Sequence, residues 1–99
     1  MKRFDGLTVL ITGATGGFGS TSAKMFAEEG ANLVLSDHPS QPLEDFAKEF
    51  STPVKTLAGD VSDPALHEEL VKLAQSEFGH LDVAVNNAGI SHGLSLIHI

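Results

Sequence analysis

Cysteine is absent from the 99-residue sequence, and its absence excludes two kinds of structure. A chain without thiols has neither a disulfide framework nor a thiolate metal site, and this fits a reducing compartment. Tryptophan and tyrosine are absent as well, so the six aromatic side chains are all phenylalanines. We therefore expect a cytoplasmic protein that folds without cross-links.

Basic residues are few, since six Lys and Arg stand against thirteen Asp and Glu, for a formal net charge of -7. They are scattered and form no patch. So acidic a chain disfavours DNA, RNA and anionic membrane surfaces as partners. The first apolar run, residues 7–11, contains Thr8 and is too short for a signal peptide or a membrane span. We expect no nucleic acid and no membrane as partner.

Histidines do not make up for the missing metal ligands. Five are present, namely His38, His67, His80, His92 and His98. None is paired at the spacing of metal ligands, and no cysteine accompanies them. We expect no metal site.

Two apolar patterns alternate along the chain. Short runs without polar alternation are typical of parallel strands covered on both faces, and they occupy residues 7–11, 32–36, 54–58 and 81–85. The segments between them have helical spacing, most clearly at Leu43, Phe46, Ala47 and Phe50. For the third helix, Asp63 is a suitable N-cap and Pro64 a suitable first residue.

This alternation predicts the order β-α-β-α-β-α-β with right-handed crossovers. We expect an α/β fold of the Rossmann type, a doubly wound parallel sheet of four strands in the order 3-2-1-4. Because 99 residues are fewer than such a sheet normally needs, residues 1–99 are interpreted as a single partial domain. The fourth strand then lies at a sheet edge, and its unpaired backbone groups should make the isolated chain poorly stable.

A glycine-rich segment follows the first predicted strand directly and reads Thr12-Gly13-Ala14-Thr15-Gly16-Gly17-Phe18-Gly19. Between a strand and a helix, such a turn presents backbone N–H groups and a helix N-terminus to a pyrophosphate. Gly13 would form the tight turn, Gly17 would allow close approach of the ligand, and Gly19 would pack the helix on the strand. A plain tight turn is the alternative. We predict a dinucleotide site that includes Gly13, Thr15, Gly16, Gly17, Phe18 and Gly19.

Asp37 lies eighteen residues after Gly19, at the end of the second predicted strand. A carboxylate there can accept both hydroxyl protons of an adenosine ribose and would repel a 2′-phosphate, which selects NAD over NADP. No Lys or Arg stands at position 38 or in the glycine-rich segment to hold such a phosphate. The alternative is that Asp37 only begins a turn before Pro39. We expect NAD as cofactor, with NADP less favoured.

A second motif, Asn86-Asn87-Ala88-Gly89, follows the fourth predicted strand. With it, the chain resembles the short-chain dehydrogenase/reductase family, whose signature T-G-x-x-x-G-x-G is matched by Thr12, Gly13, Gly17 and Gly19. The same segment also fits T-G-x-x-G-x-x-G, which resembles the family's extended branch of sugar-nucleotide epimerases and dehydratases. The N-N-A-G motif resembles the compact dehydrogenase branch and favours it.

The resemblance implies further contacts with the cofactor. Asp60 would hydrogen-bond the adenine, and Val61 would pack against it. The alternative for Asp60 is that it merely starts the turn toward Pro64. The ribose would be lined by Asn87, Ala88 and Gly89.

Two more features follow from the resemblance. Asn86 and Asn87 would tie the fourth strand to its neighbours. Gly16 fills the slot in which NADP-dependent members often carry a basic residue, and this again implies NAD.

The family's catalytic Tyr-x-x-x-Lys and the Ser before it are not found here, because the sequence has no tyrosine. The resemblance implies an oxidoreductase, and in the intact protein hydride transfer between NAD and a small alcohol or carbonyl substrate, with a homo-oligomer as its assembly. The 99-residue chain alone should be inactive. Residues 92–99 do not resemble the family's continuation and are interpreted as a truncated or non-native end. A sugar-nucleotide epimerase or dehydratase, or a non-catalytic dinucleotide-binding module, are the alternatives.

Overall fold

Five strands form one sheet in the order β3-β2-β1-β4-β5, in a computed structural model that describes residues 4–86 and 96–98. The strands are β1 (Thr8–Thr12), β2 (Asn32–Ser36), β3 (Val54–Thr56), β4 (Val83–Asn86) and β5 (Leu96–His98). The helices are α1 (Gly17–Glu28), α2 (Leu43–Ala47) and α3 (Pro64–Phe78). Strands β1 to β4 are parallel, so the predicted fold class and the order 3-2-1-4 are confirmed.

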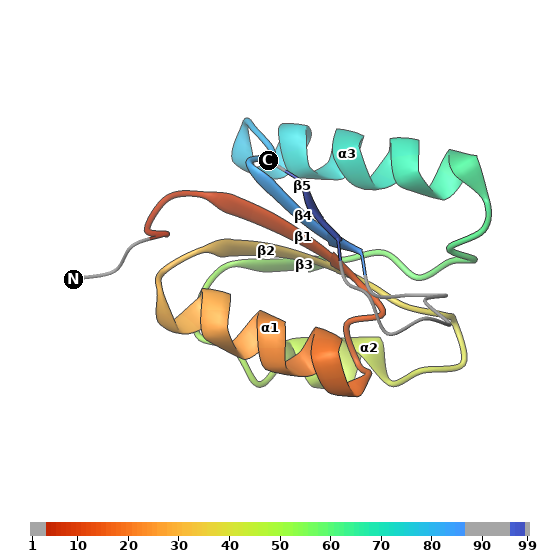
Figure 1. Cartoon of the computed structure of the whole chain (residues 1–99), viewed down its shortest axis with the longest axis horizontal. Coiled ribbons are helices and arrows are strands. Elements are labelled where there is room, and N and C mark those ends of the chain that lie inside the picture. Colours follow the sequence, from red (N-terminus) through yellow and green to blue (C-terminus); the bar gives the residue numbers. More distant parts are fainter. Residues whose placement is uncertain (1–3, 87–95, 99) are drawn as a thin grey trace.

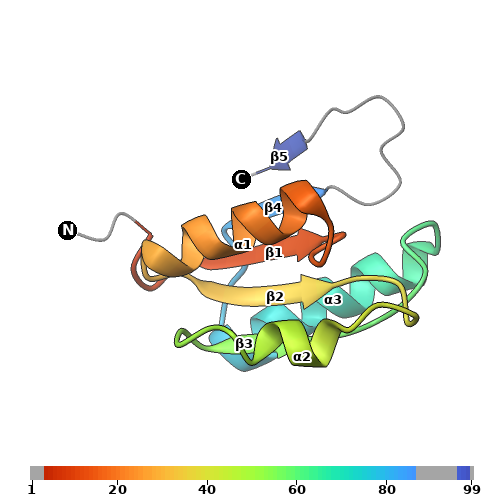
Figure 2. The same ribbon diagram turned by 90° about the horizontal axis from the view of Figure 1, so that it is seen from below.

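Helices cover both faces of the sheet, with α1 and α2 on one face and α3 on the other (Figures 1 and 2). Because successive side chains of a strand point to opposite faces, β1 divides its residues between two cores. Val9 and Ile11 pack toward α1 and α2, whereas Leu10 packs toward α3. Leu70 of α3 is fully buried there, which stabilises the fold by about 1.5–3 kcal/mol. Burial on both faces explains why the strands show no polar alternation.

Five of the phenylalanines lie in the core or pack against it. The Phe4 and Phe26 rings meet edge to face, with centroids 5.0 Å apart. Phe46 is buried under α2 and meets Phe50 in the same way at 5.1 Å. Phe78 packs against the core beneath α3. In this way both helical layers are anchored to the sheet.

Capping residues mark the ends of the long helices. The Asp63 carboxylate accepts a hydrogen bond of 3.0 Å from the Ala65 N–H, as expected of an N-cap. Gly79 ends α3 with a φ of 86°, and Gly30 follows α1 with a φ of 88°, a conformation that favours glycine. Within the described part of the chain, no helix has the length and apolar character needed to cross a membrane.

Some element bounds differ from the expected ones. The helical spacing that ends at Phe50 forms only the five-residue α2, which stops at Ala47. Strand β3 ends at Thr56 rather than at residue 58, although the Leu57 N–H still bonds to the Leu35 carbonyl at 3.1 Å. Apolar spacing marks which side chains are buried, but backbone pairing sets where an element ends.

The expectation that β4 lies at the sheet edge is wrong. Strand β5 pairs with it antiparallel, with Ala84 opposite His98 and Asn86 opposite Leu96 (Figure 1). Residues 96–98, part of the segment 92–99 that we interpreted as a truncated or non-native end, thus form a fifth strand. Three residues are too few to show strand periodicity, and the pairing arises because the open side of β4 offers unpaired backbone groups.

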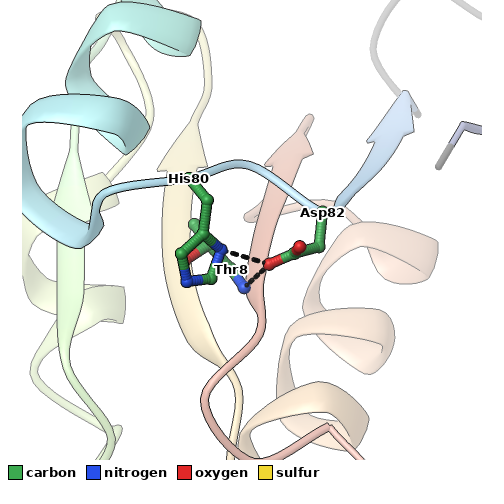
Figure 3. Close-up of polar contacts among 3 residues, drawn as sticks. All are labelled: Thr8, His80 and Asp82. Atoms are coloured by element: carbon green, nitrogen blue, oxygen red, sulfur yellow. Dashed lines mark hydrogen bonds and ion pairs between the residues drawn. The ribbon is translucent and has the colours of Figure 1, made fainter.

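Strands β1 and β4 are also joined by a side chain at their amino ends. One carboxylate oxygen of Asp82 accepts hydrogen bonds from the Thr8 N–H at 2.8 Å and from His80 Nδ1 at 2.5 Å (Figure 3). The Asp82 N–H in turn bonds to the Thr8 carbonyl at 3.0 Å. This contact lies at the end of the sheet opposite to the carboxyl ends of the strands, and it sets the register of β4 on β1.

Candidate functional site

A cleft of about 450 Å³ lies at the carboxyl ends of the parallel strands, where ligands bind in open α/β sheets. It contains all the binding residues that the sequence predicted between positions 13 and 61: Gly13, Thr15, Gly16, Gly17, Phe18, Gly19, Asp37, Asp60 and Val61. Asn87, Ala88 and Gly89 lie outside the described residues. The fold therefore gathers segments that follow β1, β2 and β3 around one space.

The glycine-rich segment turns sharply between β1 and α1. Gly13 has a φ of 64°, which suits the tight turn expected of it. A Cβ at Gly19 would lie 2.0 Å from the Gly13 carbonyl oxygen, so the start of α1 packs directly on the turn. A Cβ at Gly17 would meet no atom within 4 Å, and it would project into space that a ligand can fill. The three glycines thus have the separate geometries that a phosphate-binding turn requires.

Helix α1 begins at this turn without a side chain to cap it. Its N-cap is Gly16, and no capping hydrogen bond from a described side chain reaches the first turn. The N–H groups of Gly17, Phe18 and Gly19 have no acceptor within the helix, and the helix dipole makes this end attractive to an anion. Because no Lys or Arg lines the cleft among the described residues, a pyrophosphate would be held by these N–H groups.

The Asp37 carboxylate is held in the cleft by three hydrogen bonds. Its Oδ2 accepts from the Thr15 N–H at 2.9 Å and from the Thr15 hydroxyl at 2.6 Å. Its Oδ1 accepts from the His38 N–H at 2.7 Å, a local bond typical of a turn. The turn alternative for Asp37 is therefore part of its role. The bonds from Thr15 go further, because they join the carboxylate to the glycine-rich segment.

Asp60 is exposed, lines the cleft after β3, and accepts the hydrogen bonds that hold the turn before α3. Its Oδ1 accepts from the Ser62 N–H at 2.9 Å and the Ser62 hydroxyl at 2.7 Å. These bonds hold the pKa of Asp60 below its ordinary value, with a smaller contribution from the charge of His38. The turn expected as the alternative is thus present, and the contact with adenine stays a prediction.

Residues 7–98 match the family model described as short chain dehydrogenase. The chain belongs to the short chain dehydrogenase family. The match agrees with the resemblance drawn from the glycine-rich segment and the N-N-A-G motif, and it does not favour the extended branch of epimerases and dehydratases.

Relatives of this chain include named enzymes. A diacetyl reductase of Staphylococcus epidermidis, described as forming (S)-acetoin, is 41% identical over 95 residues, which are 93% of this chain and 37% of that protein. A 7alpha-hydroxysteroid dehydrogenase of Bacteroides fragilis is 32% identical over 92 residues, 90% of this chain and 36% of that protein. The chain thus spans well under half of the length of these relatives.

Solved structures agree with this chain in fold. A short-chain dehydrogenase/reductase from Brucella melitensis superposes with a TM-score of 0.85 at 38% identity, over 93% of this chain and 40% of that one. The L-sorbose reductase from Gluconobacter frateurii, complexed with NADPH and L-sorbose, gives 0.80 at 34% identity, over 91% of this chain and 36% of that one. The family binds nicotinamide dinucleotides.

Several residues that the sequence did not predict also line the cleft: Thr12, Ser36, His38, Gln41 and Gly59. Thr12 and Ser36 are register partners at the ends of β1 and β2, so the strand ends alone could have indicated them. The buried Ser36 hydroxyl has no hydrogen-bond partner among the described residues. Gln41 could not be predicted from the sequence, because it lies in the loop between β2 and α2, where no regular pattern marks the residues that face the cleft.

Asn86 has the tying role that the resemblance implied. The Thr12 hydroxyl donates a hydrogen bond of 2.6 Å to the Asn86 side-chain oxygen, across the paired ends of β1 and β4. Phe18 lines the cleft at the start of α1 and is 71% exposed, so it adds an apolar surface there. The cleft thus combines N–H donors that could bind an anion, a carboxylate that could accept from hydroxyls, and an apolar ring.

Proposed function

We propose that this chain is the dinucleotide-binding part of an NAD-dependent oxidoreductase that transfers hydride between NAD and a small alcohol or carbonyl substrate. The position of Asp37 carries the choice of cofactor. Its carboxylate lies in the cleft at the end of β2, where it can accept ribose hydroxyl protons and repel a 2′-phosphate. Positions 16 and 38 are Gly and His, so neither provides a Lys or Arg that could hold that phosphate.

The residues of the cleft fit a dinucleotide in three places. The uncapped start of α1 can bind the pyrophosphate, and the open space beside Gly17 lets it come close to the backbone. Asp37 can accept hydrogen bonds from the ribose. The bound cofactor supplies the hydride chemistry, and the protein binds and orients it. The substrate class rests on relatives named as a diacetyl reductase and a hydroxysteroid dehydrogenase. We also propose that the protein works in the cytoplasm, since its sequence contains no cysteine.

The 99-residue chain by itself should bind the cofactor without turning over a substrate. The family's acid–base tyrosine has no counterpart, because the sequence contains no tyrosine. A dehydrogenase assay of the purified chain with NAD and a panel of secondary alcohols should show no rate above background. Measurable hydride transfer would mean that another residue supplies the acid.

Isothermal titration calorimetry of the chain with NAD and with NADP tests the proposed cofactor. NAD should bind more tightly. Asp37→Ala should reduce the difference between the binding free energies of NAD and NADP by about 1–3 kcal/mol, the size of a lost charge-assisted hydrogen bond. Asp45→Ala is the matched control, because Asp45 is 82% exposed on α2 and away from the cleft. Equal or tighter binding of NADP by the unaltered chain would contradict the proposal, and a chain that binds neither dinucleotide would refute the site.

A further inference from the structure

Thr15 makes two hydrogen bonds to the same atom, Asp37 Oδ2. The backbone N–H lies at 2.9 Å and the hydroxyl at 2.6 Å, and 22 positions in the sequence separate the two residues. The hydroxyl has a second neighbour, Gln41 Oε1, at 3.3 Å. A hydroxyl has only one proton to donate, and the shorter distance and the negative charge both favour the carboxylate. The Thr15 hydroxyl therefore donates its proton in a hydrogen bond to Asp37 and not to Gln41.

These bonds leave a defined part of the carboxylate open. Each carboxylate oxygen accepts about two hydrogen bonds. Oδ2 is filled by Thr15, whereas Oδ1 accepts only the His38 N–H at 2.7 Å among the described residues. The remaining acceptor position of Oδ1 is free for a ribose hydroxyl. By occupying Oδ2, Thr15 leaves Oδ1 as the oxygen that a ligand can contact.

A carboxylate held in one orientation discriminates more sharply between NAD and NADP than one that rotates freely. Asp37 is only half-buried, so without Thr15 its side chain could rotate away from a 2′-phosphate and lose its orientation toward the ribose. Donors on Oδ2 prevent this rotation before the ligand arrives, which lowers the entropic cost of binding.

We propose that Thr15 is a positioning residue for cofactor choice, which acts through Asp37 and sets the preference for NAD over NADP. The proposal rests on the proposed function, since it assumes that the adenosine ribose binds at Asp37. It assigns to Thr15 a role different from a direct contact with the cofactor. The same hydrogen bonds could instead act as a latch that must break when the ribose binds, and the two roles predict opposite effects of removing the hydroxyl.

The test compares Thr15→Val with Thr15→Ser in calorimetric titrations of the 99-residue chain with NAD and with NADP. Thr15→Val keeps the side-chain shape and the backbone N–H donor but loses the hydroxyl donor. It should weaken NAD binding about tenfold, the value of one hydrogen bond to a charged group. The ratio of NAD to NADP affinity should fall with it. Thr15→Ser keeps the donor and should restore both values.

Two controls separate positioning from general damage. Thr56→Val removes a hydroxyl that also bonds to a carboxylate, that of Glu44, outside the cleft, and it should leave the affinity ratio unchanged. In an Asp37→Ala background, Thr15→Val should not change the ratio further, because the group through which Thr15 acts is gone.

The outcomes distinguish this proposal from the proposed function. If the unaltered chain binds neither dinucleotide, the proposed function fails and this proposal fails with it. If the chain prefers NAD but Thr15→Val binds NAD equally well with an unchanged ratio, Thr15 positions nothing and only this proposal fails. If Thr15→Val binds NAD more tightly, the contact is a latch, and positioning is again refuted.

Discussion

Gly19 lies so close to Gly13 that a Cβ at position 19 would come within 2.0 Å of the Gly13 carbonyl oxygen. The obstacle is backbone, which cannot move aside as a flexible side chain would. The first turn of α1 and the end of β1 are therefore locked together, and the N–H groups that face the cleft depend on this contact.

Gly19→Ala should destabilise the protein and displace the glycine-rich segment. Alanine favours a helix over glycine by about 1 kcal/mol, but the clash with backbone should outweigh this gain and cost a net 1–3 kcal/mol or so. Urea unfolding measures the loss. Gly17→Ala is the matched control, because nothing lies within 4 Å of a Cβ at that position. Equal unfolding midpoints for the two variants would show that the contact does not constrain the fold.

Gly17→Val should abolish binding of both NAD and NADP while the chain still folds. The branched side chain would occupy the space by which a pyrophosphate approaches α1, and its Cβ would meet no protein atom within 4 Å. Calorimetric titration measures binding, and circular dichroism checks that the helices persist. Normal NAD binding by the variant would exclude the glycine-rich segment as the site.

Ser62→Ala should raise the pKa of Asp60 toward its ordinary value of 3.8, because the variant loses the Ser62 hydroxyl, which contributes most to lowering it. A carboxyl group whose pKa is lower in the folded state stabilises the fold above its unfolded pKa, and this contribution is lost as the pH falls through the folded pKa. The contribution should therefore be complete at neutral pH and disappear in acid below 3.8. Carboxyl carbon shifts measured by NMR across this range give the midpoint, and an unchanged midpoint would contradict the assignment.

Removal of residues 96–99 should lower the melting temperature and promote self-association. The shortened chain would expose the backbone groups of β4 that pair with Leu96, Ile97 and His98. Size-exclusion chromatography and thermal melts compare the two lengths. If both chains are monomeric with the same melting temperature, then β5 does not protect the edge, and the original expectation of an open β4 would regain support.

Much of the architecture was determined by local sequence. Hydrophobic runs buried on both faces define parallel strands, and the spacing of Leu66, Leu70 and Ala74 defines the buried side of α3. The capping role of Asp63 and the left-handed Gly79 likewise depend on neighbours within a few residues. The glycine-rich segment and Asp37 could be placed in one site because the carboxyl ends of parallel strands share one edge of the sheet.

Tertiary structure decided what depends on contacts between distant segments. The Thr15 donors reach Asp37 only after β1 and β2 pair, and Gln41 reaches the cleft through a loop without regular pattern. Strand β5 exists because β4 offers it a partner, and a three-residue segment has no periodicity to show this beforehand. Local propensity acts between neighbours in sequence, whereas hydrogen bonds across the sheet form only once the chain has folded, and this is why the details of the site came from the fold.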